Sequence, residues 1–126
     1  MKAPERASPG DHVQENQIHV YNDKVVLEVQ GAKWASFTNT NSMDPYLDAE
    51  ANSLEITPKS SNEIKTGDII SYYSGITGDL IVHRVVEKGT DENGTYFMVK
   101  GDNNPQRDPE KIRFDQVHGV LIGIIY

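Results

Sequence analysis

Three short polar segments carry the residue types that could do catalytic chemistry. They are residues 41–45 (Asn-Ser-Met-Asp-Pro), residues 82–85 (Val-His-Arg-Val) and residues 100–108, which begin Lys-Gly-Asp-Asn-Asn. Ser42 and His83 are 41 residues apart, and Asp108 lies 25 residues beyond His83. Only folding can bring such distant residues together, which is how serine, histidine and carboxylate normally meet in hydrolases. The sequence therefore indicates a candidate serine, histidine and carboxylate centre.

The chemical types in these segments complement one another. A serine hydroxyl is a poor nucleophile near neutral pH unless a base removes its proton during the attack. Histidine, whose unperturbed pKa is about 6.5, is the side chain best matched to that task. A carboxylate on the other ring nitrogen holds the tautomer and stabilises the imidazolium ion. On residue types alone, simpler interpretations stay open: His83 can be a core histidine, and Ser42, Asp102 and Asp108 can be turn residues.

Composition excludes several classes of function. The chain has 126 residues, a length typical of a single domain. With 12 lysines and arginines against 19 acidic residues, its net charge of −7 argues against a nucleic-acid partner. The absence of cysteine excludes disulfides, thiolate catalysis and cysteine-bound zinc. Because the four histidines show no close pairing and no phosphate-binding glycine motif is present, we expect neither a metal nor another cofactor.

The two ends of the chain differ in character. Residues 1–16 lack apolar periodicity and are rich in charge and proline, so we expect a flexible polar tail and no secretory signal. Residues 17–126 are expected to form a single β catalytic domain. The longest apolar run, residues 120–126, holds seven residues, against roughly 20 for a membrane-spanning helix. The chain itself is therefore expected to be soluble.

Apolar alternation and turn residues predict an all-β fold. Residues 17–29 are expected to form a hairpin around Asn22-Asp23. The partly aromatic residues 34–37 lead into residues 38–42, whose hydrogen-bonding side chains favour a loop that carries Ser42. Further strands are expected near residues 54–56, 68–73, 80–87, 95–100 and 117–126, with a turn at Asn93-Gly94 and one capped helical turn at residues 60–63. A partly open β-barrel or coiled antiparallel sheets, with at most short helical turns, is the predicted architecture.

Strand parity constrains the candidate base. A period of two residues places His83 on the same face as Ile81 and Val85, and Arg84 on the opposite face. We therefore expect His83 to be half buried.

Taken in order, these segments resemble the type I signal peptidases, in particular their archaeal and endoplasmic-reticulum branch. Residues 42–45 (Ser-Met-Asp-Pro) are similar to the family's nucleophile box, and residues 67–70 (Gly-Asp-Ile-Ile) to the box that opens the next strand. Residues 83–86 (His-Arg-Val-Val) resemble the general-base box, in which bacterial relatives carry lysine. Residues 100–104 (Lys-Gly-Asp-Asn-Asn) are similar to the last box. The resemblance spans most of the chain.

The resemblance implies a role for each matching residue. Ser42 would be the nucleophile and His83 its general base. Of the two acidic positions in the last box, Asp108 would be the third catalytic member and Asp102 a supporting residue. The Ser42 backbone N–H and the hydroxyl of Thr40 would stabilise the oxyanion, a contribution typically worth about a hundredfold in rate. Met43 would help to wall the site.

The activity implied is that of a serine endopeptidase. It would remove N-terminal signal peptides of secreted preproteins after small residues of the Ala-x-Ala type, because shallow apolar pockets exclude larger side chains. Such enzymes are usually anchored in the membrane, so the resemblance implies a catalytic domain on the extracytoplasmic face and an anchor absent from this chain. The fold implied is the signal peptidase type, which the LexA-like repressor domains share.

Two alternatives remain open on the sequence. One is a self-cleaving LexA-like peptidase domain, although the base position holds histidine and residues 1–16 contain no Ala-Gly cleavage site. The other is a non-enzymatic or inactive β-module that binds extended peptides by strand addition.

Overall fold

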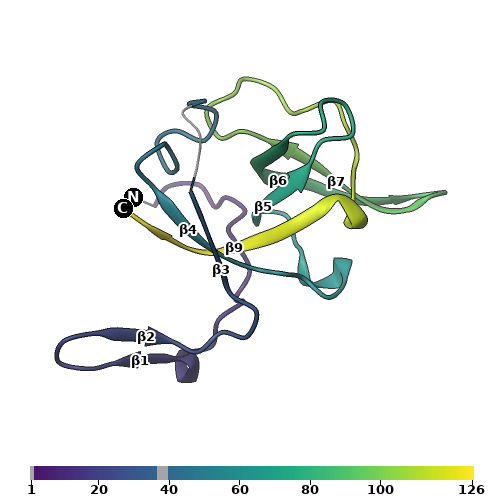
Figure 1. Cartoon of the computed structure of the whole chain (residues 1–126). Coiled ribbons are helices and arrows are strands. Elements are labelled where there is room, and N and C mark those ends of the chain that lie inside the picture. The colour runs from purple at the N-terminus through teal and green to yellow at the C-terminus, as the bar shows by residue number, and fades with distance from the viewer. Residues whose placement is uncertain (1, 37–39) are drawn as a thin grey trace.

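Antiparallel strands form almost all of the regular structure. The computed structural model describes residues 2–36 and 40–126, and Figure 1 shows the path of the chain. The strands are β1 (Ile18–Val20), β2 (Val25–Leu27), β3 (Lys33–Ser36), β4 (Asn52–Ile56), β5 (Ile69–Tyr73), β6 (Leu80–Asp91), β7 (Gly94–Lys100), β8 (Ile112–Arg113) and β9 (Val117–Ile125). Three single 3-10 turns accompany them: η1 (Glu15–Gln17), η2 (Ser61–Glu63) and η3 (Phe114–Gln116). The predicted all-β class is confirmed.

Two antiparallel sheets contain these strands. The larger sheet has the order β3-β4-β9-β5-β6-β7-β8, and its edge strands β3 and β8 do not pair with each other in the described part of the chain. The larger sheet is therefore coiled and open, and it does not close into a barrel. The C-terminal strand β9 lies between β4 and β5 and so joins the two halves of the chain.

Strand β5 is buried on both faces, which explains its nearly continuous apolar sequence. Ile69 and Ile70 point to opposite faces because side chains alternate along a strand. On one face lies a cluster of eight buried residues: Ile64, Ile70, Tyr72, Val85, Phe97, Val99, Ile112 and Val120. On the other face lies a cluster of five: Met43, Leu47, Ala51, Ile69 and Leu121. The second cluster includes the residue directly after Ser42, so the candidate nucleophile is attached to a core.

The predicted hairpin over residues 17–29 is confirmed. Its strands β1 and β2 pair with Ile18 opposite Leu27 and Val20 opposite Val25. Figure 1 shows the hairpin projecting from the larger sheet. Its aliphatic side chains are exposed, so it contributes little to the core.

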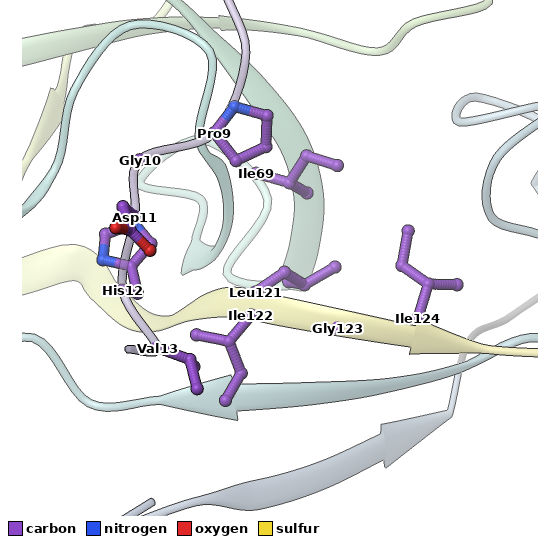
Figure 2. A pocket seen from close by; sticks show the side chains of 10 residues that line it. All are labelled: Pro9, Gly10, Asp11, His12, Val13, Ile69, Leu121, Ile122, Gly123 and Ile124. Carbon is purple, nitrogen blue, oxygen red and sulfur yellow. The ribbon is translucent and has the colours of Figure 1, made fainter. Parts of the chain in front are cut away.

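Residues 8–12 lie against the larger sheet. The Gly10 backbone N–H and His12 Nε2 bond Asp68 Oδ1 at 2.8 and 2.9 Å, and the Lys65 backbone N–H donates to Asp68 Oδ2 at 2.8 Å. Figure 2 shows this segment beside β9, where it lines a cavity of about 330 Å³ with Ile69 and residues 121–124. A Cβ at Gly67, where φ is +106°, would overlap the Ser8 backbone, so this position needs glycine. The flexibility of the tail stays a prediction.

Several element boundaries differ from expectation. The predicted capped turn at residues 60–63 is a 3-10 turn in which the Ser60 side chain makes no cap, and Glu63 accepts a hydrogen bond from the Lys59 backbone instead. Strand β6 continues to Asp91, beyond the predicted end at residue 87, because its pairing with β7 is maintained up to Asp91 and Gly94. The short strand β8 escaped detection because Ile112 stands alone among polar residues. Of the predicted run at 34–37, residue 37 lies outside the described residues, as do residues 38 and 39 of the following loop.

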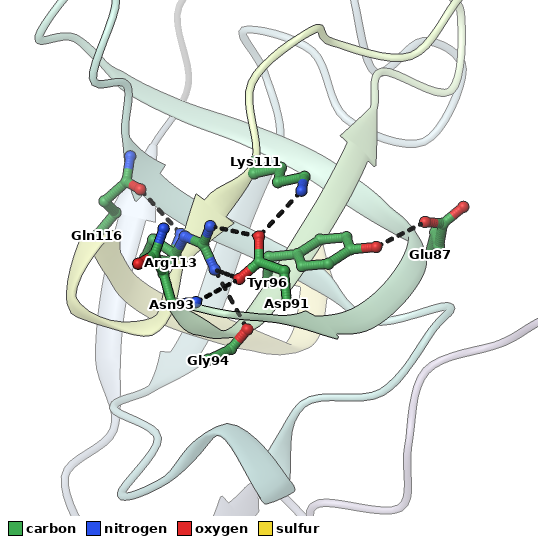
Figure 3. A network of polar contacts seen from close by, with 8 residues as sticks. All are labelled: Glu87, Asp91, Asn93, Gly94, Tyr96, Lys111, Arg113 and Gln116. Atoms are coloured by element: carbon green, nitrogen blue, oxygen red, sulfur yellow. Dashed lines mark hydrogen bonds and ion pairs between the residues drawn. The ribbon is translucent and has the colours of Figure 1, made fainter.

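A polar network fastens β8 to the end of the β6–β7 hairpin (Figure 3). The Asp91 carboxylate accepts hydrogen bonds from Arg113 Nη1 and Nη2 at 2.9 and 2.8 Å and from Lys111 Nζ at 2.9 Å. It also accepts one from the Asn93 backbone in the turn. The bonds from Arg113 and Lys111 hold the pKa of Asp91 well below its usual range.

Because the pKa of Asp91 is lowered by folding, its contribution to stability is present above the ordinary aspartate pKa of about 3.9 and is lost as the pH falls through the folded value. We expect Asp91→Asn to lower the urea midpoint at pH 7. The difference from wild type should shrink as the solution is acidified below the ordinary value. Asp23→Asn, in the exposed β1–β2 turn, serves as the control and should change little. If Asp91→Asn lowered the urea midpoint by the same amount at pH 7 and below the ordinary aspartate pKa, the result would contradict this role.

Candidate catalytic site

Ser42 lies on the loop between β3 and β4, and the last polar segment holds that loop in place. The Asn103 backbone N–H donates to the Ser42 carbonyl at 2.9 Å, and Asn103 Nδ2 donates to the Asn41 carbonyl at 3.1 Å. A Cβ on Gly101 would come within 2.6 Å of the Ser42 carbonyl oxygen, so only glycine permits this approach. Two of the predicted segments therefore meet directly.

The backbone around Ser42 has an unusual local conformation. Asn41 has φ of +64°, in the left-handed region that asparagine adopts more readily than most residues. The hydroxyls of Thr40 and Ser42 are 3.2 Å apart, within hydrogen-bond distance. Thr40 is thus placed next to the candidate nucleophile, and its role toward an oxyanion stays a prediction.

Met43 anchors the loop to the core. Its side chain is buried with Leu47, Ile69 and Leu121. Its sulfur also accepts a weak hydrogen bond from the Asp102 backbone N–H at 3.3 Å. Met43 lines the same cleft as Ser42, and its role as a wall of an active site stays a prediction.

His83 is paired with Asp108. His83 Nδ1 is 2.8 Å from Asp108 Oδ2, and Tyr72 donates its hydroxyl hydrogen to the same carboxylate oxygen at 2.8 Å. The Tyr72 oxygen is also 3.3 Å from His83 Nδ1. His83 is 7% exposed, so it is more buried than the half-buried state expected. In the described part of the chain, His83 Nε2 makes no hydrogen bond, which leaves it available to another group.

Tyr72 contacts the candidate catalytic residues, and the sequence analysis did not predict this. It lies on β5 opposite Ile81, two residue pairs away from the Ile70–His83 pair, so its side chain lies on the same face of the sheet as that of His83. Burial, followed by its hydrogen bond to Asp108, raises the pKa of Tyr72 far above the usual value. Its hydroxyl therefore keeps its proton and acts as a donor to Asp108. The available signal was strand parity together with the phenol group, but a buried aromatic residue in a strand is usually interpreted as core.

Asp102 binds Arg84 and has no direct bond to His83 in the described residues. Arg84 Nε and Nη2 donate to the two carboxylate oxygens of Asp102, each at 2.9 Å, and Arg84 Nη1 donates to the Gly67 carbonyl at 2.8 Å. The bond to Asp102 raises the pKa of Arg84. Two neighbouring residues of β6 thus contact two different aspartates of the last polar segment: His83 contacts Asp108, and Arg84 contacts Asp102.

No hydrogen bond joins Ser42 to His83 among the described atoms. Ser42 lines a cleft of about 310 Å³ together with Ile81 and Val82, the residues directly before His83. Catalytic hydrogen bonds are often long in an unliganded site and tighten when substrate binds. The cleft lining includes neither His83 nor Asp108, so the approach of Ser42 to His83 stays a prediction.

The cleft beside Ser42 also contains a group that the sequence reading did not consider. Glu55 on β4 lines it and is 2% exposed, and Ser71 on β5 donates a short hydrogen bond to Oε1. Leu54 and Ile56 predicted a strand near residues 54–56 but gave no reason to expect a buried carboxylate between them. No group of three or more possible metal ligands occurs in residues 2–36 and 40–126.

Comparisons with known proteins place the chain near one archaeal protein. It is 35% identical over 79 residues to the uncharacterized protein MJ0260 of Methanocaldococcus jannaschii, which covers 57% of this chain. The chain spans 38% of the length of that relative. No protein-family model matches the chain, and no solved structure matches it significantly. No helix within the described residues is long and apolar enough to cross a membrane.

The hydroxyl of Tyr72 can be tested apart from its ring. We expect Tyr72→Phe to lower the free energy of unfolding by about 1.5 kcal/mol, because a hydrogen bond to a charged carboxylate is lost inside the protein. The Nδ1 resonance of His83 should also shift in the nuclear magnetic resonance spectrum. Tyr96→Phe is the matched control, since the Tyr96 hydroxyl makes a long bond of 3.5 Å at the surface. An unchanged His83 resonance in Tyr72→Phe would contradict the contact.

Proposed function

We propose that this protein is a serine endopeptidase of the type I signal peptidase kind, in its archaeal and endoplasmic-reticulum branch. Its substrates would be N-terminal signal peptides of secreted preproteins, cut after small residues in an Ala-x-Ala pattern. The observation that carries the proposal is the 2.8 Å contact between His83 Nδ1 and Asp108, next to the strand residues that share a cleft with Ser42. The resemblance of four ordered segments to that family supports the same conclusion.

In the proposed mechanism, the Ser42 hydroxyl oxygen attacks the scissile carbonyl while His83 Nε2 accepts the hydroxyl proton. Asp108 holds the proton on Nδ1, fixes the ring tautomer and stabilises the imidazolium ion. His83 then gives the proton to the leaving amine, and the peptide bond breaks to form an acyl-enzyme. A water molecule, deprotonated by His83, hydrolyses the ester and restores the Ser42 hydroxyl.

The oxyanion of the tetrahedral intermediate would be stabilised by the Ser42 backbone N–H and the Thr40 hydroxyl. The 3.2 Å separation of the two hydroxyl oxygens supports this assignment, because Thr40 lies within reach of charge that develops near Ser42. Left-handed Asn41 turns the backbone between these two residues.

Asp102 would act as a positioning residue. Its paired hydrogen bonds to Arg84 fix one end of the last segment, and the neighbouring Asn103 backbone holds the Ser42 loop. A bidentate arginine–carboxylate pair is stronger and more directional than a single ion pair. Asp102 therefore sets the distance between the nucleophile loop and the strand that carries His83.

The proposed place of action is the extracytoplasmic face of a membrane, reached through an anchor outside this chain or through a membrane partner. Signal peptides emerge there in an extended form before they are cut. The chain spans 38% of its archaeal relative's length, so the anchor belongs to the proposal for the whole protein.

The decisive test is cleavage of a fluorogenic Ala-x-Ala peptide by the purified protein. We expect Ser42→Ala and His83→Ala each to lower kcat/KM by about 10³-fold or more, because each removes a group that the chemistry needs. Far-ultraviolet circular dichroism should stay at the wild-type level. His19→Ala, on the exposed hairpin, is the control for His83→Ala and should cleave normally.

The other functions predict different results in the same experiment. Cleavage that persists in Ser42→Ala or His83→Ala would overturn the assigned roles. Two fragments in the intact mass after long incubation, with no peptide turnover, would indicate a self-cleaving domain. Peptide binding that survives Ser42→Ala, with no turnover by wild type, would indicate a non-enzymatic β-module.

A further inference from the structure

A buried carboxylate lines the cleft beside Ser42. Glu55 lines this cleft of about 310 Å³ together with the apolar side chains of Met43, Leu47, Leu80 and Val82. Only 2% of Glu55 is exposed. An apolar cleft that contains one buried acid differs from the shallow apolar pockets that the family resemblance implies.

Three neighbouring strands build the position of Glu55. Its side chain extends from β4 across Gly119 of β9 toward Ser71 of β5, whose hydroxyl donates to Oε1. A Cβ on Gly119 would overlap the Glu55 carboxylate, so a glycine leaves room for it in the middle of the sheet. The Ser53 hydroxyl donates to Oε2 at 3.4 Å. The carboxylate is therefore held in place by side chains from separate strands.

The hydrogen-bond partners of Glu55 are neutral. No lysine or arginine of the described residues forms an ion pair with it within 4.0 Å. Lys33 stands opposite Glu55 in the β3–β4 ladder, but its ammonium group donates to the His118 carbonyl at 2.9 Å. A buried carboxylate is costly unless a cation or further donors compensate it. A cationic ligand group would supply that compensation.

We propose that this cleft binds a lysine side chain of the extended peptide substrate, with the alkyl stem against Met43 and Leu47 and the ammonium group at Glu55. This inference rests on the proposed function and adds to it a specificity determinant. The cleft holds far more than the methyl group of alanine, since a water molecule takes about 30 Å³ in the liquid. The lysine therefore occupies a position other than the small residues of the Ala-x-Ala pattern.

The test compares lysine with norleucine, which has nearly the same stem and no ammonium group. Each remaining position on either side of the cut in an Ala-x-Ala peptide is changed to one or the other. At one position we expect wild type to prefer lysine by about tenfold or more in kcat/KM, as for a hydrogen bond between charged groups. Glu55→Gln should reduce that preference to about onefold. Glu92→Gln, in the exposed β6–β7 turn, should retain it.

Binding to Ser42→Ala, measured by calorimetry, separates this inference from the proposed function. A lysine preference in binding without turnover by wild type would refute the peptidase and retain the cleft. If wild type cleaved the lysine and norleucine peptides at equal rates at every position, the result would refute the lysine-binding role of the cleft and leave the peptidase function standing. If Glu55→Gln does not fold, as judged by circular dichroism, the wild-type comparison of lysine with norleucine still decides the outcome. Serine and 2-aminobutyrate differ in the same way, by a neutral hydroxyl group. If wild type preferred a peptide with serine over one with 2-aminobutyrate and showed no preference for lysine, the proposal would also be overturned.

Discussion

The candidate site depends on the close approach of two loops at Gly101. The Ser42 carbonyl lies where any Cβ on Gly101 would collide with it, and the Asn103 backbone N–H then donates to that carbonyl at 2.9 Å. The approach requires glycine at position 101, and it allows the Ser42 carbonyl to accept a backbone hydrogen bond. Ser42 is thus held by the segment that also contains Asp102 and Asp108, so the candidate nucleophile and both candidate acids are tied to one stretch of chain.

The two faces of strand β6 carry different contacts to the last polar segment. His83 points to the face with the larger buried cluster, where Tyr72 and Asp108 hold its ring. Arg84 points to the opposite face, where Asp102 binds it through two hydrogen bonds. Because adjacent residues on a strand cannot share a face, one strand positions both the candidate base His83 and Arg84, which binds Asp102. A shift of one residue in the β5–β6 register would exchange the two and separate His83 from Asp108.

The sequence predicted those parts of the fold whose signals are local. The alternation around Asn22-Asp23 predicted the β1–β2 hairpin, and turn chemistry at Asn93-Gly94 predicted the turn between β6 and β7. Strand parity predicted that His83 and Arg84 face opposite sides. The Ser42 position could be predicted only as a loop, because its partner Asn103 is far away in sequence. The assigned roles of Ser42, His83 and Asp108 stay predictions until cleavage is measured.

What the sequence could not predict depends on pairing between distant strands. Strand β9 lies between β4 and β5, and neither its position nor the register beside Ser71 can be derived from alternation alone. The same insertion creates the space over Gly119 that Glu55 fills, so the buried acid is invisible until three strands are assembled. In sequence, Glu55 resembles an exposed residue in an alternating strand.

The burial of Glu55 is hard to explain by stability alone. Among the described residues, Glu55 has only hydroxyl partners, so its buried carboxylate loses the solvation of its charge, and an apolar residue of similar volume would avoid that cost. Its partners belong to different strands, and Gly119 gives up a side chain to make room for it. Costs of this kind are typical of positions that act on a ligand, because a group that is poorly compensated in the free protein is well compensated in the complex. Since Ser42 lines the same cleft, a ligand whose cationic group compensates the Glu55 charge would also lie beside the candidate nucleophile.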